Sequence, residues 1–174
     1  MPEPNCVEML LDEIDRALKA ELYVVATMAA LTLPDMCAAL ETEGFWAKNV
    51  NYVAWCEKNL PQEFFSLATP ELMKQLRNDL LHTGTVDDRK GNKKLILTIP
   101  NGRIHLSNNV CNDAYAYDAK DFCLVITNGV KRWLVANEKN EIIQKNLQNL
   151  LQYRVHGMAP YIVGLPIIVI EARL

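Results

Sequence analysis

The chain contains 174 residues, of which 50% are hydrophobic and 22% are charged. This composition supports one folded domain spanning residues 1–174 and excludes an intrinsically disordered chain. The formal net charge of −3 argues against a broadly basic surface that grips duplex nucleic acid. An RNA partner would therefore need a local site or a single strand.

The five cysteines are widely spaced and form no Cys-x-x-Cys pair. An odd number in this arrangement argues against a disulfide framework and against a zinc site. We therefore expect no metal and no cofactor. Cys37 and Cys56 fall within apolar helical patterns and are expected in the core.

The two ends of the chain carry no recognisable targeting segment. Residues 1–5 lack the basic and apolar regions of a secretory signal. The apolar run of residues 161–170 is too short to span a bilayer as a helix, and it contains Gly164 and Pro166. We expect a buried strand or an extended tail near residues 160–174, a cytoplasmic location and no membrane partner.

Apolar residues at helical spacing predict a first helix that ends near Lys19. Asn5 is its expected N-cap, and Glu8 three residues later completes a capping-box pattern. A second apolar helix is expected over residues 22–40.

Pro34 should kink or break this second helix, because proline lacks the backbone N–H and clashes with the preceding turn. Gly44 marks the expected end of the segment.

A third helix is expected over residues 47–60, stopped by Pro61, with one side formed by Val50, Val53, Ala54 and Trp46. The sequence Thr69-Pro70-Glu71 predicts the start of a fourth helix, with an N-cap, a first-turn proline and an acidic residue near the positive end of the dipole. This helix is expected to end before Gly84 and to bury Leu72, Met73, Leu76 and Leu80.

The character of the chain changes after residue 87, where a polar loop over residues 87–94 precedes a candidate strand at residues 95–99. Asn101-Gly102 is a strong hairpin signal, and residues 103–106 would form the returning strand. Tyr115 and Tyr117 alternate as in a half-buried strand. A β-hairpin is therefore expected near residues 93–117.

Helical spacing resumes near Asp118 and continues to Leu134, and a last amphipathic helix is expected from Ile142 to Leu151. The expected fold class is mainly α, a bundle of about five or six helices with a small β-hairpin inserted in the second half.

The segment Arg77-Asn78-Asp79-Leu80-Leu81-His82 resembles the Arg-Asn-x-x-x-His signature of HEPN domains. Residues 30–37, 52–55 and 121–134 also look like the corresponding parts of small bacterial HEPN-like proteins, so the resemblance covers about residues 7–150. It implies a helical-bundle fold, a homodimer with paired motifs at its interface, and metal-independent endoribonuclease activity, often in a toxin or defence setting.

The residue types in the motif suit RNA cleavage by the 2′-hydroxyl. Histidine as a residue type changes its charge near neutral pH, so His82 is a candidate base or acid, and Arg77 offers a planar, permanently charged fork to phosphate. Asn78 is a candidate binding residue that orients His82 or contacts the ribose. Asp35 is a second candidate, which either holds Arg77 in place or faces solvent and caps the helix after Pro34.

Helical geometry separates the two catalytic candidates. Arg77 and His82 are five positions apart, which places them about 140° from each other around an ideal helix. They meet at one phosphate only if the last turn loosens, if the arginine curls along its stem, or if a second subunit completes the site. The resemblance implies this last arrangement.

Non-catalytic alternatives stay open. Arg77 would then pair with Asp35, Glu71 or Asp79, and His82 would cap its helix. The domain would serve as a nucleotide-binding or protein-assembly module with a structural dimer interface, or as a small-ligand sensor.

The charged loop around residues 89–94 is better explained as solvated than as an RNA guide. His105 and His156 have no metal-like neighbour at suitable spacing.

Overall fold

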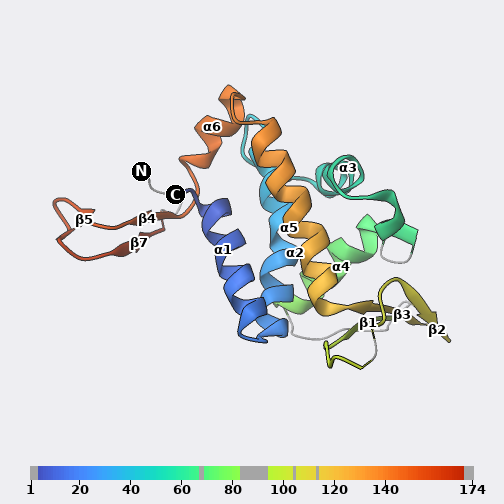
Figure 1. Ribbon diagram of the computed structural model, residues 1–174. Helices are drawn as coiled ribbons and strands as arrows, with labels where there is room; N and C mark the ends of the chain where they lie inside the picture. The colour runs from blue at the N-terminus through green and yellow to red at the C-terminus, as the bar shows by residue number, and fades with distance from the viewer. Residues whose placement is uncertain (1–3, 67–68, 83–93, 104, 113, 171–174) are drawn as a thin grey trace.

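Helix α2 (Tyr23–Leu40) is the central element of the computed structural model, and the other helices pack around it (Figure 1). The structure describes residues 4–66, 69–82, 94–103, 105–112 and 114–170. Within these ranges the helices are α1 (Cys6–Lys19), α2, α3 (Asn49–Asn59), α4 (Pro70–His82), α5 (Ala119–Ala136), α6 (Glu141–Leu147) and a short 3-10 helix, η1 (Gln62–Ser66). The expectation of a mainly α fold with about six helices is confirmed.

The capping box at the start of α1 is present as predicted. The Asn5 side chain accepts a hydrogen bond from the Glu8 N–H at 3.0 Å, and the Glu8 carboxylate accepts one from the Asn5 N–H at 2.9 Å. Two of the backbone donors that a helix leaves unpaired at its start are thereby satisfied.

Helix α2 continues through Pro34, so of the two expected effects of this proline, a kink or a break, the break is wrong. Proline removes one intrahelical hydrogen bond, but Pro34 is buried and neighbouring helices pack along the whole of α2. The helix ends at Leu40, before Gly44, and its last carbonyl has a partner on another helix. The buried Asn146 amide on α6 donates to the carbonyls of Leu40 (3.0 Å) and Thr42 (2.8 Å).

Among the described residues, α2 is also the one helix that is long and apolar enough to cross a bilayer. Half of it is buried inside the bundle, where it contacts α1, α3, α4, α5 and α6. A central core helix meets the same length and composition criteria as a membrane span, and the packing around α2 is that of a core helix.

Helix α3 buries Cys56 as expected, but the side that was expected to hold Trp46 and Val50 is not its core face. Tyr52, Trp55 and Cys56 are buried, whereas Trp46 and Val50 are exposed. Trp55 packs edge-on against Trp133 of α5, with ring centroids 6.2 Å apart. The aromatic side chains therefore decided which face is buried, since they remove more apolar area from water than valine does.

Helix α4 begins as the sequence predicts, with the Thr69 hydroxyl accepting a hydrogen bond from the Leu72 N–H at 3.3 Å. Met73 is fully buried, and Leu72, Leu76 and Leu80 are partly buried. The expected stop at Gly84 lies outside the described residues, and so does the charged loop that follows it, up to residue 93.

A three-stranded sheet of β1 (Lys94–Thr98), β2 (Asn109–Cys111) and β3 (Ala114–Asp118) packs at one end of the bundle, in the order β1-β3-β2 (Figure 1). The expected strand after residue 94 is confirmed, but its predicted partner is wrong. β1 pairs in parallel with β3, and the antiparallel hairpin joins β2 to β3.

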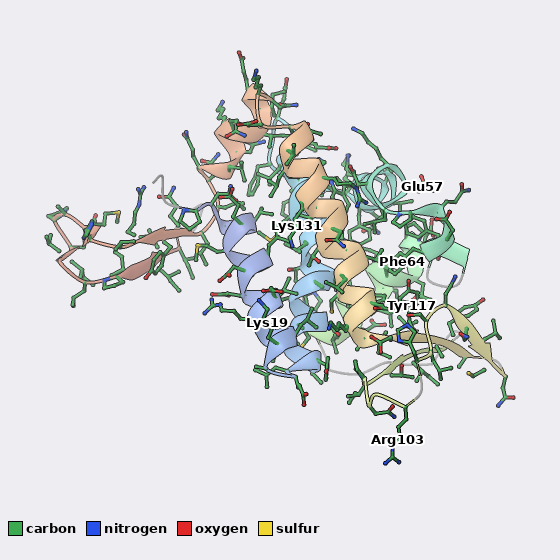
Figure 2. The ribbon with its side chains drawn as sticks, in the orientation of Figure 1. Lys19, Glu57, Phe64, Arg103, Tyr117 and Lys131 are labelled. Carbon is green, nitrogen blue, oxygen red and sulfur yellow. The ribbon has the colours of Figure 1, made fainter. Side chains whose placement is uncertain are left out.

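Asn101 and Gly102 form a local turn rather than a hairpin. The Asn101 side chain accepts from the Arg103 N–H at 2.9 Å, and Gly102 has φ +70°. The place beside β1 is taken by β3, whose Tyr117 ring packs against Phe64 of η1 with centroids 5.4 Å apart (Figure 2). Burial of this aromatic pair outweighs the local turn preference.

Helix α5 begins at an N-cap on Asp118 and runs beside α2 to Ala136. Gly129 has a packing role, because a Cβ there would lie 2.4 Å from Leu60 Cδ2 and 3.0 Å from the Asn59 carbonyl oxygen. Helix α6 ends at Leu147, earlier than predicted.

The chain then forms a β arm, defined as residues 152–170, that extends away from the helices (Figure 1). In this arm β4 (Gln152–Arg154) pairs antiparallel with β7 (Ile167–Val169), and β5 (Gly157–Met158) pairs antiparallel with β6 (Ile162–Val163). Residues 171–174 of the expected tail lie outside the described part of the chain. The alternative of a buried strand is wrong, since most of the apolar side chains of residues 161–170 are exposed.

The cysteines provide a test of this core. Cys6, Cys37, Cys56 and Cys123 are buried and Cys111 is exposed. Burial raises the pKa of Cys56 to about 12 and that of Cys123 to about 11. Since the thiolate is the reactive form, we expect iodoacetamide at pH 8 to modify Cys111 alone in the native protein and all five thiols in urea, as counted by mass spectrometry.

Rapid native modification of Cys37 or Cys56 would contradict this packing.

The same pKa shifts favour the folded state below the ordinary thiol pKa near 9. That stabilisation is lost as the pH rises from about 9 towards 12, because the unfolded thiols ionise first.

Candidate functional site

Asp35 joins α2 to α4 through two cationic side chains. Its Oδ2 lies 2.9 Å from Nη2 of Arg77, and its Oδ1 pairs with the Lys74 ammonium. All three side chains are largely but not completely buried. Of the two sequence-based alternatives for Asp35, the structure supports the one in which this carboxylate holds Arg77.

The guanidinium of Arg77 is held at more than one point. Nη1 donates to the Asn78 side-chain oxygen at 2.9 Å, while the buried Nε has no hydrogen-bond partner. Asn78 therefore contacts Arg77, and among the described contacts none joins Asn78 to His82. Because Lys74 and Arg77 both pair with the single carboxylate of Asp35, these three side chains together carry one net positive charge.

The aromatic ring of Tyr52 on α3 packs against this group of charged side chains. The Lys74 ammonium lies 4.8 Å from the centroid of the Tyr52 ring, a cation–π arrangement. Burial is the main cause that raises the pKa of Tyr52 well above its ordinary value, so its hydroxyl stays neutral. Sequence analysis placed Tyr52 only within a family-like segment and gave it no role, because the contact joins residues of two different helices.

His82 is the last residue of α4 and is exposed to solvent. The described contacts of Arg77 are with Asp35 and Asn78, and none joins it to His82. Arg77 is held against α2, and His82 is about 140° further around α4 on ideal geometry. Within a single chain, the guanidinium of Arg77 and the imidazole of His82 thus lie on different sides of α4.

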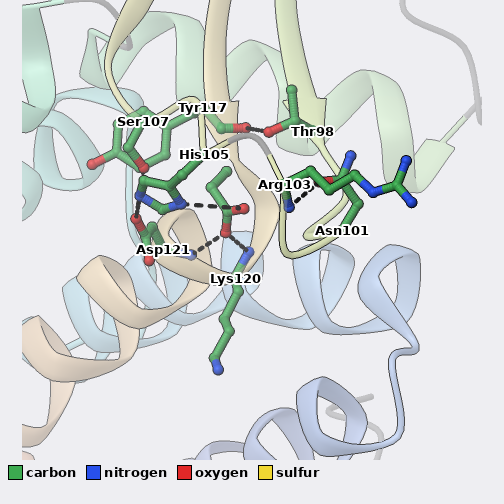
Figure 3. Close-up of polar contacts among 9 residues, drawn as sticks. Thr98, Asn101, Arg103, His105, Ser107, Tyr117, Lys120 and Asp121 are labelled. Carbon is green, nitrogen blue, oxygen red and sulfur yellow. Dashed lines mark hydrogen bonds and ion pairs between the residues drawn. The ribbon is translucent and has the colours of Figure 1, made fainter.

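A second polar group, to which the sequence assigned no site, lies where β3 meets α5 and contains His105 (Figure 3). Nε2 of His105 is 3.0 Å from Oδ2 of Asp121, and its Nδ1 is 3.9 Å from Oδ2 of the buried Asp118. The Ser107 hydroxyl donates to the same Asp121 oxygen at 2.6 Å. His105 comes from a loop, and Asp118 and Asp121 at the helix start follow it by 13 and 16 positions. No spacing motif therefore marks this group in the sequence.

Histidine with two carboxylates is a donor set that transition metals accept, but the helix opposes a cation here. Asp118 is the N-cap of α5, and its Oδ1 already accepts from the N–H groups of Lys120 (2.9 Å) and Asp121 (3.1 Å). The helix start carries partial positive charge. The arrangement is accounted for by its structural effect, which is to fasten the loop of residues 105–108 to α5.

A groove of about 970 Å³ lies at the base of the β arm, between the start of α1, the end of α5, α6 and β4. Its lining mixes apolar side chains such as Leu134 and Tyr153 with polar ones such as Glu8 and Arg154. None of the four residues that sequence analysis selected, Asp35, Arg77, Asn78 and His82, lines it.

Comparisons with known proteins add no relative. No family model, no curated protein and no solved structure matches the chain.

The Asp35 ion pairs can be tested by a double-mutant cycle. We expect Asp35→Ala to lower the free energy of unfolding in urea by roughly 1–3 kcal/mol, because it leaves two partly buried cations without a counter-charge. Arg77→Met should cost less in the Asp35→Ala background than in the wild type. Strictly additive effects would show that the pair contributes nothing to stability.

The N-cap at Asp118 gives a separate expectation. Asp118→Ala should lower the free energy of unfolding by about 1 kcal/mol, whereas Asp118→Asn should keep most of the stability because asparagine retains the capping oxygen. If Asp118→Asn were as damaging as Asp118→Ala in the same urea titration, the negative charge facing His105 would be the important property instead.

Proposed function

We propose that this chain is a HEPN-type domain that cleaves single-stranded RNA without a metal ion, using Arg77 and His82 at a site shared by two copies. The observation that carries the proposal is the ion pair between Asp35 and Arg77. It fixes the arginine of the motif on α4 against a carboxylate that lies in another part of the resemblance, the segment of residues 30–37.

The charges around Arg77 suit a phosphate. Lys74 and Arg77 exceed Asp35 by one positive charge, and all three side chains retain some exposure to solvent. A chain with a net charge of −3 has no generally basic surface, so a local cationic group is the kind of site by which it would hold a short single strand. A guanidinium held in position stabilises charge on a crowded phosphate better than a free one, because it needs little reorganisation.

His82 supplies the proton transfers. One neutral imidazole accepts the proton of the 2′-hydroxyl as that oxygen attacks phosphorus, and the bond from phosphorus to the 5′-oxygen breaks. An imidazolium, the His82 of the second copy, donates a proton to the leaving oxygen. The products are a 2′,3′-cyclic phosphate and a 5′-hydroxyl, and the two histidines exchange protonation states.

The shared site follows from the separation of the two groups within one chain. A second α4 facing the first would bring an exposed His82 towards the cationic group of its neighbour. The proposal therefore requires a homodimer through α4.

The first experiment incubates a fluorescent single-stranded RNA with purified protein in EDTA. We expect wild-type protein to cut, and Arg77→Ala and His82→Ala to cut at least 100-fold more slowly. His82→Ala is the sharper variant, because its exposed side chain has no described hydrogen bond or ion pair and its melting temperature should be unchanged. Lys131→Ala is the control, since it removes a positive charge from the exposed side of α5 (Figure 2).

Three results would contradict the proposal. These are no cutting by the wild type, equal cutting by wild type and His82→Ala, and products that lack a cyclic phosphate. A further test refolds wild type together with excess His82→Ala. Activity should fall with the square of the wild-type fraction if each site needs a histidine from both copies, and linearly if one copy suffices.

A non-catalytic assembly module is the second candidate. It is favoured by the occupancy of the guanidinium, whose two terminal nitrogens already bond Asp35 and Asn78. In that case no variant would affect RNA, and Arg77→Ala would lower the melting temperature while His82→Ala would weaken self-association alone.

A further inference from the structure

The β arm contains a long stretch without charge. Residues 155–170 include no Asp, Glu, Lys or Arg, and eleven of these sixteen residues are Val, Ile, Leu, Met, Ala or Tyr. In a chain of which 22% is charged, such a stretch is normally buried in a core. Here it lies outside the helical bundle (Figure 1).

The apolar side chains of the arm are exposed. Six of them have exposed fractions between 46% and 77%, namely Tyr161, Ile162, Val163, Leu165, Ile168 and Ile170. Neighbouring strand residues such as Ile162 and Val163 project to opposite faces, so apolar side chains are exposed on both faces of the arm. Together they amount to roughly several hundred Å² of apolar area, the size at which exposed patches of soluble proteins mark interaction sites.

The arm is nevertheless a specified structure rather than a loose tail. Gly157 has φ +80°, and a Cβ there would lie 2.2 Å from the Ile162 carbonyl oxygen, so only glycine fits the close approach of β5 and β6. The ribbon also includes a hydrogen bond from the Gly164 N–H to the His156 carbonyl at 2.9 Å.

A two-stranded ribbon is only marginally stable alone in water and needs further strands or a packing surface. Each sheet of the described arm has two strands. A further strand that pairs with the ribbon would supply such support.

We propose that the β arm binds the β arm of a second copy of this chain, so that the two apolar surfaces cover each other around a twofold axis. Burying six side chains of this kind removes about 500 Å² of surface per copy at the usual area per side chain. The total of about 1,000 Å² reaches the lower limit for a specific interface. A twofold contact needs only one surface that complements itself, and residues 155–170, which are largely apolar and carry no Asp, Glu, Lys or Arg, provide one.

The chemistry of the arm favours a second copy over a lipid surface. Peripheral membrane segments combine apolar side chains with several lysines or arginines that attract anionic lipid. Residues 155–170 contain none, and the whole chain is acidic.

The arm is also distinct from the interface of the proposed ribonuclease site. The bundle helices α1, α2 and α5 lie between the arm and α4 in Figure 1. The arm contact therefore stands apart from the proposed function, and a chain that used both surfaces would form assemblies larger than a dimer.

The experiment measures the mass of the full chain by sedimentation velocity over a range of concentrations. The chain has a mass of 19.7 kDa. We expect Val163→Asp combined with Ile168→Asp to weaken association at least tenfold, because both exposed side chains would place charge in the apolar contact. The matched control is Val50→Asp, which adds charge at an equally exposed valine on α3.

A second measurement reports on the arms directly. His156→Cys in a Cys111→Ser background provides one accessible thiol on the arm for pyrene maleimide, since the remaining cysteines are buried. Pyrene excimer emission is expected when two arms meet, and it should vanish in the Val163→Asp, Ile168→Asp variant.

Excimer emission that is absent from the wild-type background at all concentrations would overturn the proposal, even if the chain dimerises through α4. Unchanged association of the double variant would also overturn it. Binding of the monomeric wild type to phosphatidylcholine vesicles, lost in the double variant, would assign the arm to lipid instead. RNA cleavage measured on the same samples separates this proposal from the ribonuclease proposal, because either can fail alone.

Discussion

The carboxylate of Asp35 is the charge on which the α4 side of the molecule depends. It lies on the central helix, next to a buried proline, and pairs with two cations of α4. Burying a carboxylate in such a place costs free energy unless the carboxylate is paired. Holding the two cations beside each other would also cost free energy without the carboxylate of Asp35. The three groups therefore fix the rotation of α4 about its axis, and with it the directions in which Arg77 and His82 point.

This rotation connects fold to function. With Arg77 turned to α2, His82 remains at the exposed end of α4, and Asn78 bonds the guanidinium. Chemistry that needs both an imidazole and a guanidinium at one phosphate then depends on a second copy. Association is thus part of the proposed activity and not an addition to it.

The β arm offers a different kind of association. It contributes apolar area, whereas the α4 surface contributes charge and a titratable group. The two surfaces lie on different sides of the bundle (Figure 1), so evolution or engineering can alter one without disturbing the other. Salt should weaken contacts made through charge far more than contacts made through apolar area.

Local patterns predicted the parts of the fold whose causes are local. The capping box of Asn5 and Glu8 and the helix start at Thr69 depend on residues within one turn, and both are present. Patterns failed where distant residues compete. Pro34 does not break α2 because helices cover it, Asn101-Gly102 does not form the hairpin because β3 takes the place beside β1, and α3 buries its aromatic side chains in preference to Val50.

The candidate site divides in the same way. The sequence by itself determined that Arg77, Asn78 and His82 lie on one helix and that Arg77 and His82 occupy different sides of it, because helical periodicity is a property of the chain. Only the tertiary structure decided that Asp35 meets Lys74 and Arg77, that His105 meets Asp121, and that the apolar residues 161–170 lie outside the core. The physical reason is that each of these outcomes depends on which surfaces of remote elements come into contact, and this is decided by burial and pairing over the whole molecule.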